Sequence, residues 1–169
     1  MGVALNKIVM ALLVGSATLF AADKVTWAAS RTSGGHSLTR KNDTAAVNKA
    51  LLRAEGGDAS AQAFLGFMYE HGRGVPQDYV AAAYWYTRAA EHGYATAQYL
   101  LGLMYDKGHG VERSDTLAYM WLNLAAAHAP PHAKDYYTRI RDAVAAKLTA
   151  AQVDEAQWLA TGFMPKDPP

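Results

Sequence analysis

Residues 57–92 read GDASAQAFLGFMYEHGRGVPQDYVAAAYWYTRAAEH, and residues 93–128 follow without a gap as GYATAQYLLGLMYDKGHGVERSDTLAYMWLNLAAAH. An offset of 36 residues aligns the two stretches, and 16 of the 36 aligned positions are identical. A fixed period of this length is typical of proteins built from stacked repeats. We therefore expect one array of repeated units, with the rest of the chain before or after it.

Each copy contains two segments with helical spacing of apolar residues. In the first copy, Leu65 and Tyr69 lie on one face of a predicted helix that ends at Gly72. Pro76 prevents this helix from continuing, and Asp78 can cap the next one by accepting a backbone N–H bond. The second copy has Ser114 at that capping position. Each copy is therefore predicted to form a helix–turn–helix unit.

The positions shared by both copies are predicted to build the repeat core and its turns. Gly66 and Gly102 stand in the middle of the first helices, where glycine costs about 1 kcal/mol relative to alanine. We expect the missing Cβ to allow close approach of a neighbouring helix, with Ala89 and Ala90 facing the glycine. The full predicted core and turn set is Leu65, Gly66, Tyr69, Gly72, Gly74, Trp85, Leu101, Gly102, Tyr105, Gly108, Gly110 and Trp121.

These residues carry a family resemblance. The pattern A-x-x-x-LG-x-x-Y-x-x-G-x-GV, then a cap residue and A-x-x-W-x-x-x-AA, resembles the Sel-one-like repeat family, a relative of the tetratricopeptide repeat. It covers residues 57–128 strongly and residues 44–56 weakly, as a half repeat. The resemblance implies an all-α, right-handed solenoid of helix–turn–helix repeats, with about seven helices here, used as a protein-interaction scaffold.

The N-terminal residues predict export. Lys7 precedes an apolar run over residues 8–20, and small residues follow, as in a signal peptide over residues 1–22. An uncleaved signal anchor is the alternative. We expect an exported protein, in a bacterial periplasm or secreted. Residues 23–43 are polar and lack apolar periodicity, which predicts a flexible linker before a helix that starts near Thr44.

The period changes after residue 128. Residues 132–161 are predicted to form two terminal cap helices, because the last repeat cannot bury its own apolar face. Thr138 stands where the mid-helix glycine would recur. Thr149 and Gln152 form a capping-box pattern that opens the last helix. Residues 162–169 are expected to be a frayed tail.

Composition narrows the classes of function. The absence of cysteine excludes disulfides, thiolate metal sites and cysteine nucleophiles. The formal net charge is +1, and loss of residues 1–22 would remove Lys7 and leave a neutral chain. A neutral domain has no electrostatic footprint for nucleic acid. Contact with a membrane is expected only if the signal segment is uncleaved.

No catalytic, metal-binding or cofactor-binding motif is present, so we expect neither an enzyme nor a cofactor. His128 and His132 are four residues apart, but prolines between them prevent the helix that would align them on a metal. Glu70 and Asp106 could form a carboxylate pair, although solvated surface acids are the expected interpretation. Two alternatives remain open: a secreted hydrolase of cell-wall-related compounds that uses His71 or Glu70, and a structural unit whose array end self-associates.

The concave face of a helix-pair solenoid is lined by the first helix of each repeat. We predict that a segment of another protein or peptide binds there, anchored by Phe67, Tyr99 and Leu103. The alternative is that these three side chains only pack against the adjacent repeat. The predicted groove residues are Ala63, Phe67, Glu70, His71, Tyr99, Leu103, Asp106 and Lys107.

Overall fold

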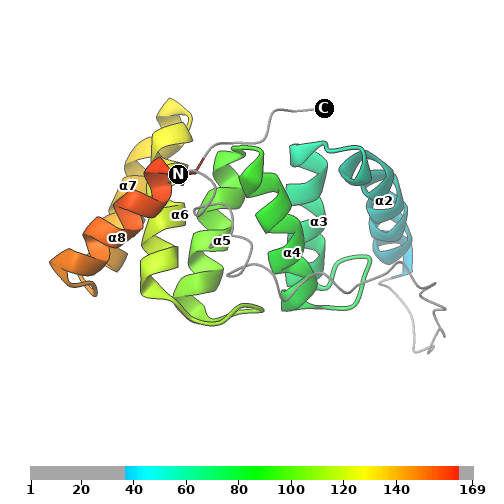
Figure 1. Ribbon diagram of the computed structural model, residues 1–169. Helices are drawn as coiled ribbons and strands as arrows, with labels where there is room; N and C mark the ends of the chain where they lie inside the picture. The colour runs from blue at the N-terminus through cyan, green and yellow to red at the C-terminus, as the bar shows by residue number, and fades with distance from the viewer. Residues whose placement is uncertain (1–36, 164–169) are drawn as a thin grey trace.

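The computed structural model describes residues 37–163, and this part of the chain forms seven helices and no strand (Figure 1). The predicted all-α solenoid is confirmed. The predicted signal peptide, residues 23–36 of the linker and residues 164–169 lie outside the described residues. The helices are α2 (Ser37–Glu55), α3 (Ala59–His71), α4 (Tyr79–Glu91), α5 (Ala95–Lys107), α6 (Asp115–His128), α7 (Pro131–Ala145) and α8 (Ala150–Thr161).

The helices stack in chain order from α2 at one end of the molecule to α7 and α8 at the other (Figure 1). The first helices, α3 and α5, end at Gly72 and Gly108, whose left-handed backbone lets their N–H groups bond back to the helix. Asp78 and Ser114 cap the second helices, α4 and α6, as predicted. Within residues 37–163, no helix combines the length and the apolar composition needed to cross a membrane.

The second loop glycine of each repeat lies against the previous second helix. A Cβ on Gly74 would come within 2.6 Å of the Asp43 carbonyl carbon, and a Cβ on Gly110 within 2.0 Å of the Tyr79 carbonyl oxygen. Both glycines also have positive φ, +72° and +70°. Asp43 and Tyr79 are themselves 36 residues apart. The 36-residue offset therefore relates the contacts between neighbouring repeats as well as the equivalent residues within each repeat.

Helix α2 starts earlier than expected, so the predicted linker is wrong over residues 37–43. The helix is predicted to start near Thr44, but residues 42–44 lie inside α2, and Asp43 and Thr44 contact the first loop. Arg73 pairs with Asp43 at 3.3 Å, and the Thr44 hydroxyl donates to the Gly74 carbonyl at 3.2 Å. The Asp43 and Thr44 side chains, which could cap a helix N-terminus, therefore form tertiary contacts instead.

Helix α2 stands where the second helix of a preceding repeat would be. The buried Gln62 amide donates to the Ala54 carbonyl at 3.0 Å, and the buried Gln98 amide donates to the Ala90 carbonyl at 3.1 Å. Donors and acceptors are each related by the 36-residue offset. A buried carbonyl in the last helical turn therefore has a partner at both junctions between repeats.

Each mid-helix glycine makes room for a side chain of its partner helix. A Cβ on Gly66 would lie 2.5 Å from the Tyr86 ring, and one on Gly102 would lie 2.8 Å from Leu122 Cγ. Tyr86 and Leu122 occupy equivalent positions in the two repeats. The side chain nearest Gly66 is that of Tyr86, so the expectation that Ala89 and Ala90 face the glycine was wrong. Both alanines are fully buried elsewhere in the core. At Gly66 the space holds the Tyr86 ring. At Gly102 the added Cβ would also lie 3.2 Å from the Ala118 carbonyl oxygen of α6, so the expected close approach of a neighbouring helix backbone is confirmed there.

The last two helices both pack against α6 and contact each other little. Tyr137 of α7 is buried at the position equivalent to Leu65 and Leu101. Helix α7 thus takes the place of a third first helix. The predicted capping box at Thr149 and Gln152 is present at the start of α8.

Helix α8 crosses the outer face of α6. Gln157 donates to the Tyr119 hydroxyl at 3.4 Å, while the Phe163 ring, just after α8, lies 5.2 Å from the Trp121 ring. Successive helical residues point about 100° apart, so Met120 lies on the outer face between those two contacts. Met120 is fully buried. The C-terminal helix therefore caps the array from outside.

Candidate partner-binding surface

The predicted groove residues of the first repeat divide into one buried residue and three accessible ones. Ala63 is buried in the core, so its placement in an exposed groove was wrong. Its small side chain faces the next repeat instead of solvent. Phe67 and Glu70 are half-buried, and His71 is exposed.

Phe67 is the centre of an aromatic and cationic cluster at the end of α3. The His71 ring lies 4.2 Å from the Phe67 ring, and its Nδ1 donates to the Phe67 carbonyl at 3.0 Å. The Arg73 guanidinium lies 6.0 Å from the same ring. The cluster therefore places an apolar ring beside two basic side chains, of which Arg73 is already paired with Asp43.

Glu70 is held inside the first repeat. The Tyr86 hydroxyl donates to Glu70 Oε2 at 2.7 Å. Burial, reinforced by the hydrogen bond to Glu70, raises the pKa of Tyr86 far above its usual range. The Gln77 amide also donates to the Glu70 backbone carbonyl at 2.7 Å. The Glu70 carboxylate is therefore committed to a contact within the fold.

Tyr99 of the second repeat is covered by α7. Its ring stacks on Tyr137 with centroids 4.5 Å apart, and its hydroxyl shares a 3.1 Å hydrogen bond with the Tyr136 hydroxyl. Burial and the Tyr136 hydroxyl raise the pKa of Tyr99. The predicted anchor Tyr99 therefore packs against the adjacent helix, which was the alternative that the sequence left open.

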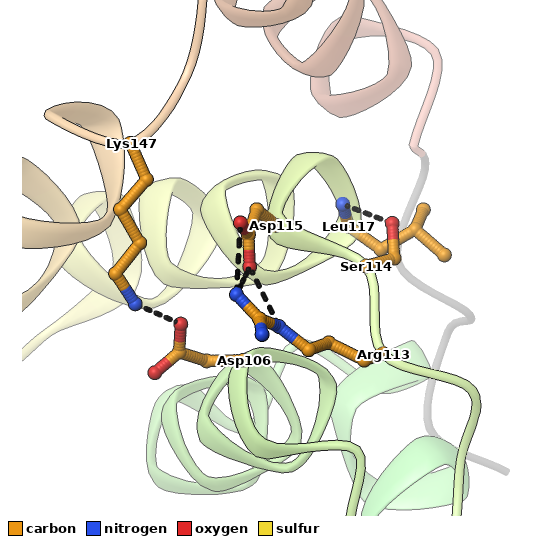
Figure 2. Close-up of polar contacts among 6 residues, drawn as sticks. All are labelled: Asp106, Arg113, Ser114, Asp115, Leu117 and Lys147. Carbon is orange, nitrogen blue, oxygen red and sulfur yellow. Dashed lines mark hydrogen bonds and ion pairs between the residues drawn. The ribbon is translucent and has the colours of Figure 1, made fainter.

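Asp106 joins the second repeat to the end of α7. Figure 2 shows Lys147 reaching across to this carboxylate, with Nζ 2.5 Å from Asp106 Oδ1. Arg113 makes a separate ion pair with Asp115 at 3.3 Å, next to the Ser114 cap (Figure 2). Glu70 and Asp106 thus occupy equivalent positions but have different partners. Neither is placed with the other as a catalytic carboxylate pair.

Leu103 and Lys107 are the second-repeat positions that remain accessible. Leu103 is half-buried and Lys107 is exposed. Lys107 forms no ion pair or hydrogen bond within residues 37–163. These two residues are equivalent to Phe67 and His71. The accessible surface on α3 and α5 therefore consists of two apolar side chains, each followed four residues later by a group that carries or can carry positive charge.

Helix α7 adds residues to this surface that sequence reasoning missed. Asp135, Thr138 and Arg139 line an open hollow of about 510 Å³. The 36-residue offset makes them the counterparts of Tyr99, Gly102 and Leu103, because α7 takes the place of a third first helix. The offset already related Thr138 to the mid-helix glycine, and extending it to residues 135 and 139 would have found the other two.

The described residues do not suggest a metal centre. No group of three His, Cys, Asp or Glu side chains between residues 37 and 163 could hold an ion. His128 instead donates from Nδ1 to Gln98 Oε1 at 3.0 Å, close to the junction between α4 and α5. His128 therefore binds the oxygen of the same Gln98 amide whose nitrogen donates to the Ala90 carbonyl.

Comparison with known proteins agrees with the repeat architecture. The family model described as the Sel1 repeat matches residues 59–94 and 95–129. No curated protein matches the chain. Proteins that contain Sel1 repeats are generally protein-interaction scaffolds.

Two solved structures show the same kind of fold. One is a protective antigen of uropathogenic Escherichia coli strains with an SLR fold, 34% identical, with a TM-score of 0.67, covering 75% of this chain and 26% of that chain. Another is a Sel1 repeat protein from Oxalobacter formigenes, 40% identical, with a TM-score of 0.52, covering 54% of this chain and 26% of that chain. This chain spans about a quarter of either protein. The chain therefore contains two Sel1 repeats, within a short all-α solenoid.

Proposed function

We propose that the chain is a non-enzymatic interaction module that binds a segment of a partner protein along the first helices α3, α5 and α7. The observation that carries the proposal is the contrast between committed acids and accessible cations on this surface. Glu70 and Asp106 are engaged by Tyr86 and Lys147, whereas Lys107 is exposed and has no partner among the described residues. Along α3 and α5 the surface therefore favours anionic groups.

The accessible apolar side chains define the rest of the partner. Phe67 and Leu103 are half-buried at equivalent positions of adjacent repeats, so each offers a contact to an apolar side chain. His71 and Lys107 follow them by four residues, which is about one helical turn. We propose that the bound segment alternates apolar residues with carboxylates, because that pattern complements both features.

We also propose that the module acts outside the cytoplasm, in a bacterial periplasm or after secretion. The support is the charge and hydropathy pattern of residues 1–22. Fractionation of cells that produce the native chain tests this, and recovery only from the cytoplasm would contradict it.

In-cell crosslinking can identify the partner. A photoreactive amino acid at position 107 should capture a protein, and the same amino acid at the exposed control position 112, in the loop after α5, should not. Lys107→Glu should then weaken binding of the captured protein by about tenfold, while Glu112→Lys leaves it unchanged. Equal capture at both positions, or unchanged affinity of Lys107→Glu, would overturn the proposal.

A further inference from the structure

The second helices α4 and α6 have outer faces at equivalent sequence positions, but another helix covers only one of these faces. On α6, Met120 and Leu124 are buried, 0% and 8% exposed, beneath α8. On α4, the equivalent positions are Tyr84 and Arg88. Tyr84 is 41% exposed, and Val80, one turn earlier, is 59% exposed. The outer face of α4, defined by Val80, Tyr84 and Arg88, is therefore open where that of α6 is covered by a helix.

Helix α8 shows what this face can accommodate. It seats Ala156, Leu159 and Ala160 in the core against α6 and crosses that helix on its outer side. The backbones of α4 and α6 are equivalent, so the outer face of α4 can receive a helix in a similar position. The side chains on α4 then decide which helix fits.

Arg88 gives the outer face of α4 a charge preference. Its guanidinium lies 5.9 Å from the Tyr84 ring and 5.6 Å from the Trp85 ring, and it donates to the Tyr84 hydroxyl at 3.3 Å. It pairs with no carboxylate among residues 37–163. A complementary helix would therefore carry a carboxylate opposite Arg88 and a large apolar side chain opposite Val80 and Tyr84.

The solvent-facing side of α8 carries this combination. Trp158 is 58% exposed, although it is among the most apolar residues of the chain, and Asp154 and Glu155 are exposed one turn before it. Asp154 and Trp158 are four positions apart, which is about 6 Å along a helix, and Tyr84 and Arg88 have the same spacing. Antiparallel helices would therefore align the tryptophan with Tyr84 and the acids with Arg88.

We propose that the outer face of α4 in one copy binds the solvent-facing side of α8 in a second copy, so that two copies form a symmetric pair through two reciprocal contacts. Both surfaces lie on the outer side of the second helices, so a two-fold axis can make both contacts at once. End-to-end stacking through α2 is disfavoured, because Lys49 and Arg53 occupy the positions of Trp85 and Ala89 there and are exposed.

Light scattering of the protein purified in its native form tests the pairing. The average mass should rise from one chain mass to two as concentration increases. Trp158→Ala should raise the dissociation constant at least tenfold, because it removes the central aromatic contact. Tyr94→Ala is the matched control, since Tyr94 is a 38% exposed aromatic residue outside both surfaces. It should leave the dissociation constant unchanged.

A charge exchange distinguishes this contact from a general loss of stability. Arg88→Glu and the double variant D154R/E155R should each weaken the pair, and a chain that carries all three changes should recover it. Capture of a partner at position 107 should persist in Trp158→Ala, because the groove lies on other helices. A single chain mass at every concentration would overturn the proposal. A pair that withstands both Trp158→Ala and Arg88→Glu would also overturn it.

Discussion

The two Sel1 repeats share their internal contacts and differ in what they present to their surroundings. Gln62 and Gln98 make the same bond to the preceding helix, and both loops begin with glycines that have positive φ. Yet Glu70 is held by Tyr86 within its own repeat, whereas Asp106 is held by Lys147 in the turn after α7. The comparison indicates that identical positions maintain the stack and differing positions decide which surfaces stay open.

The largest effect is expected at the contact that both repeats share with the preceding helix. Gly110→Ala places a Cβ 2.0 Å from the Tyr79 carbonyl oxygen and forces alanine to a φ of +70°. It should destabilise the fold by about 3 kcal/mol or more, because neither backbone can move cheaply. Urea denaturation measures this. Gly56→Ala, an exposed control, should change stability by less than about 1 kcal/mol.

The mid-helix glycines can sharpen the comparison, since their partners differ. Gly66→Ala should cost about 2 kcal/mol, because its Cβ meets the Tyr86 ring at 2.5 Å, even though alanine is the better helix former. Tyr86→Leu copies the second repeat, where the equivalent contact with Leu122 is 2.8 Å, and so lessens the contact. In this background Gly66→Ala should cost about 1 kcal/mol less. Additive losses in the double variant would argue against direct contact.

The start of the first helix is capped in one repeat only. Asp58 accepts from the Ala61 backbone, while Tyr94 at the equivalent position makes no side-chain cap. Asp58→Ala should therefore cost about 1 kcal/mol, and Tyr94→Asp should gain up to about that amount. Thermal unfolding of both variants measures the two effects. Equal losses from both substitutions would show that the repeats do not differ in this way.

The Asp58 cap also predicts a pH dependence. Hydrogen bonds from the Ala61 backbone and Ser60, with the nearby Arg53, lower the pKa of Asp58 from 3.8 to about 2. Because the folded-state pKa is lowered, the stabilisation is present above about pH 4 and is lost as the pH falls toward 2. Wild-type protein should therefore lose its stability advantage over Asp58→Ala in that range.

The smallest effect on stability is expected at the ion pair between Asp106 of the second repeat and Lys147, just after α7. Lys147→Met should cost about 0.5 kcal/mol, because the ion pair with Asp106 is partly exposed to solvent and screened by salt. Arg113→Met removes a local ion pair and is the control, with an expected cost near zero. A difference that persists in high salt would contradict an electrostatic tie.

The repeat offset was enough to predict the helices, the turn glycines and the caps, because these depend on local chemistry that recurs at 36 residues. Asp78 and Ser114 are examples, since each caps the helix that follows it. The start of α2 could not be predicted in the same way. Its polar residues Asp43 and Thr44 bond to a loop 30 residues away.

The candidate surface was harder to predict, because exposure depends on what covers each repeat. Ala63 and Tyr99 occupy equivalent positions that were expected to face a groove, but each packs toward the following repeat. Likewise, no pattern within α6 indicates that α8 crosses it. Met120 and Tyr84 share a repeat position, and only the presence of α8 makes one buried and the other exposed.

The most direct test exchanges the accessible residues of the two repeats. A variant with Phe67→Leu, His71→Lys, Leu103→Phe and Lys107→His exchanges two pairs of equivalent residues between the repeats. Its amino-acid composition is unchanged. Its unfolding free energy should stay within about 1 kcal/mol of wild type, while its affinity for the protein captured at position 107 falls at least tenfold. Unchanged affinity in a folded variant would contradict the claim that these positions decide which partner binds.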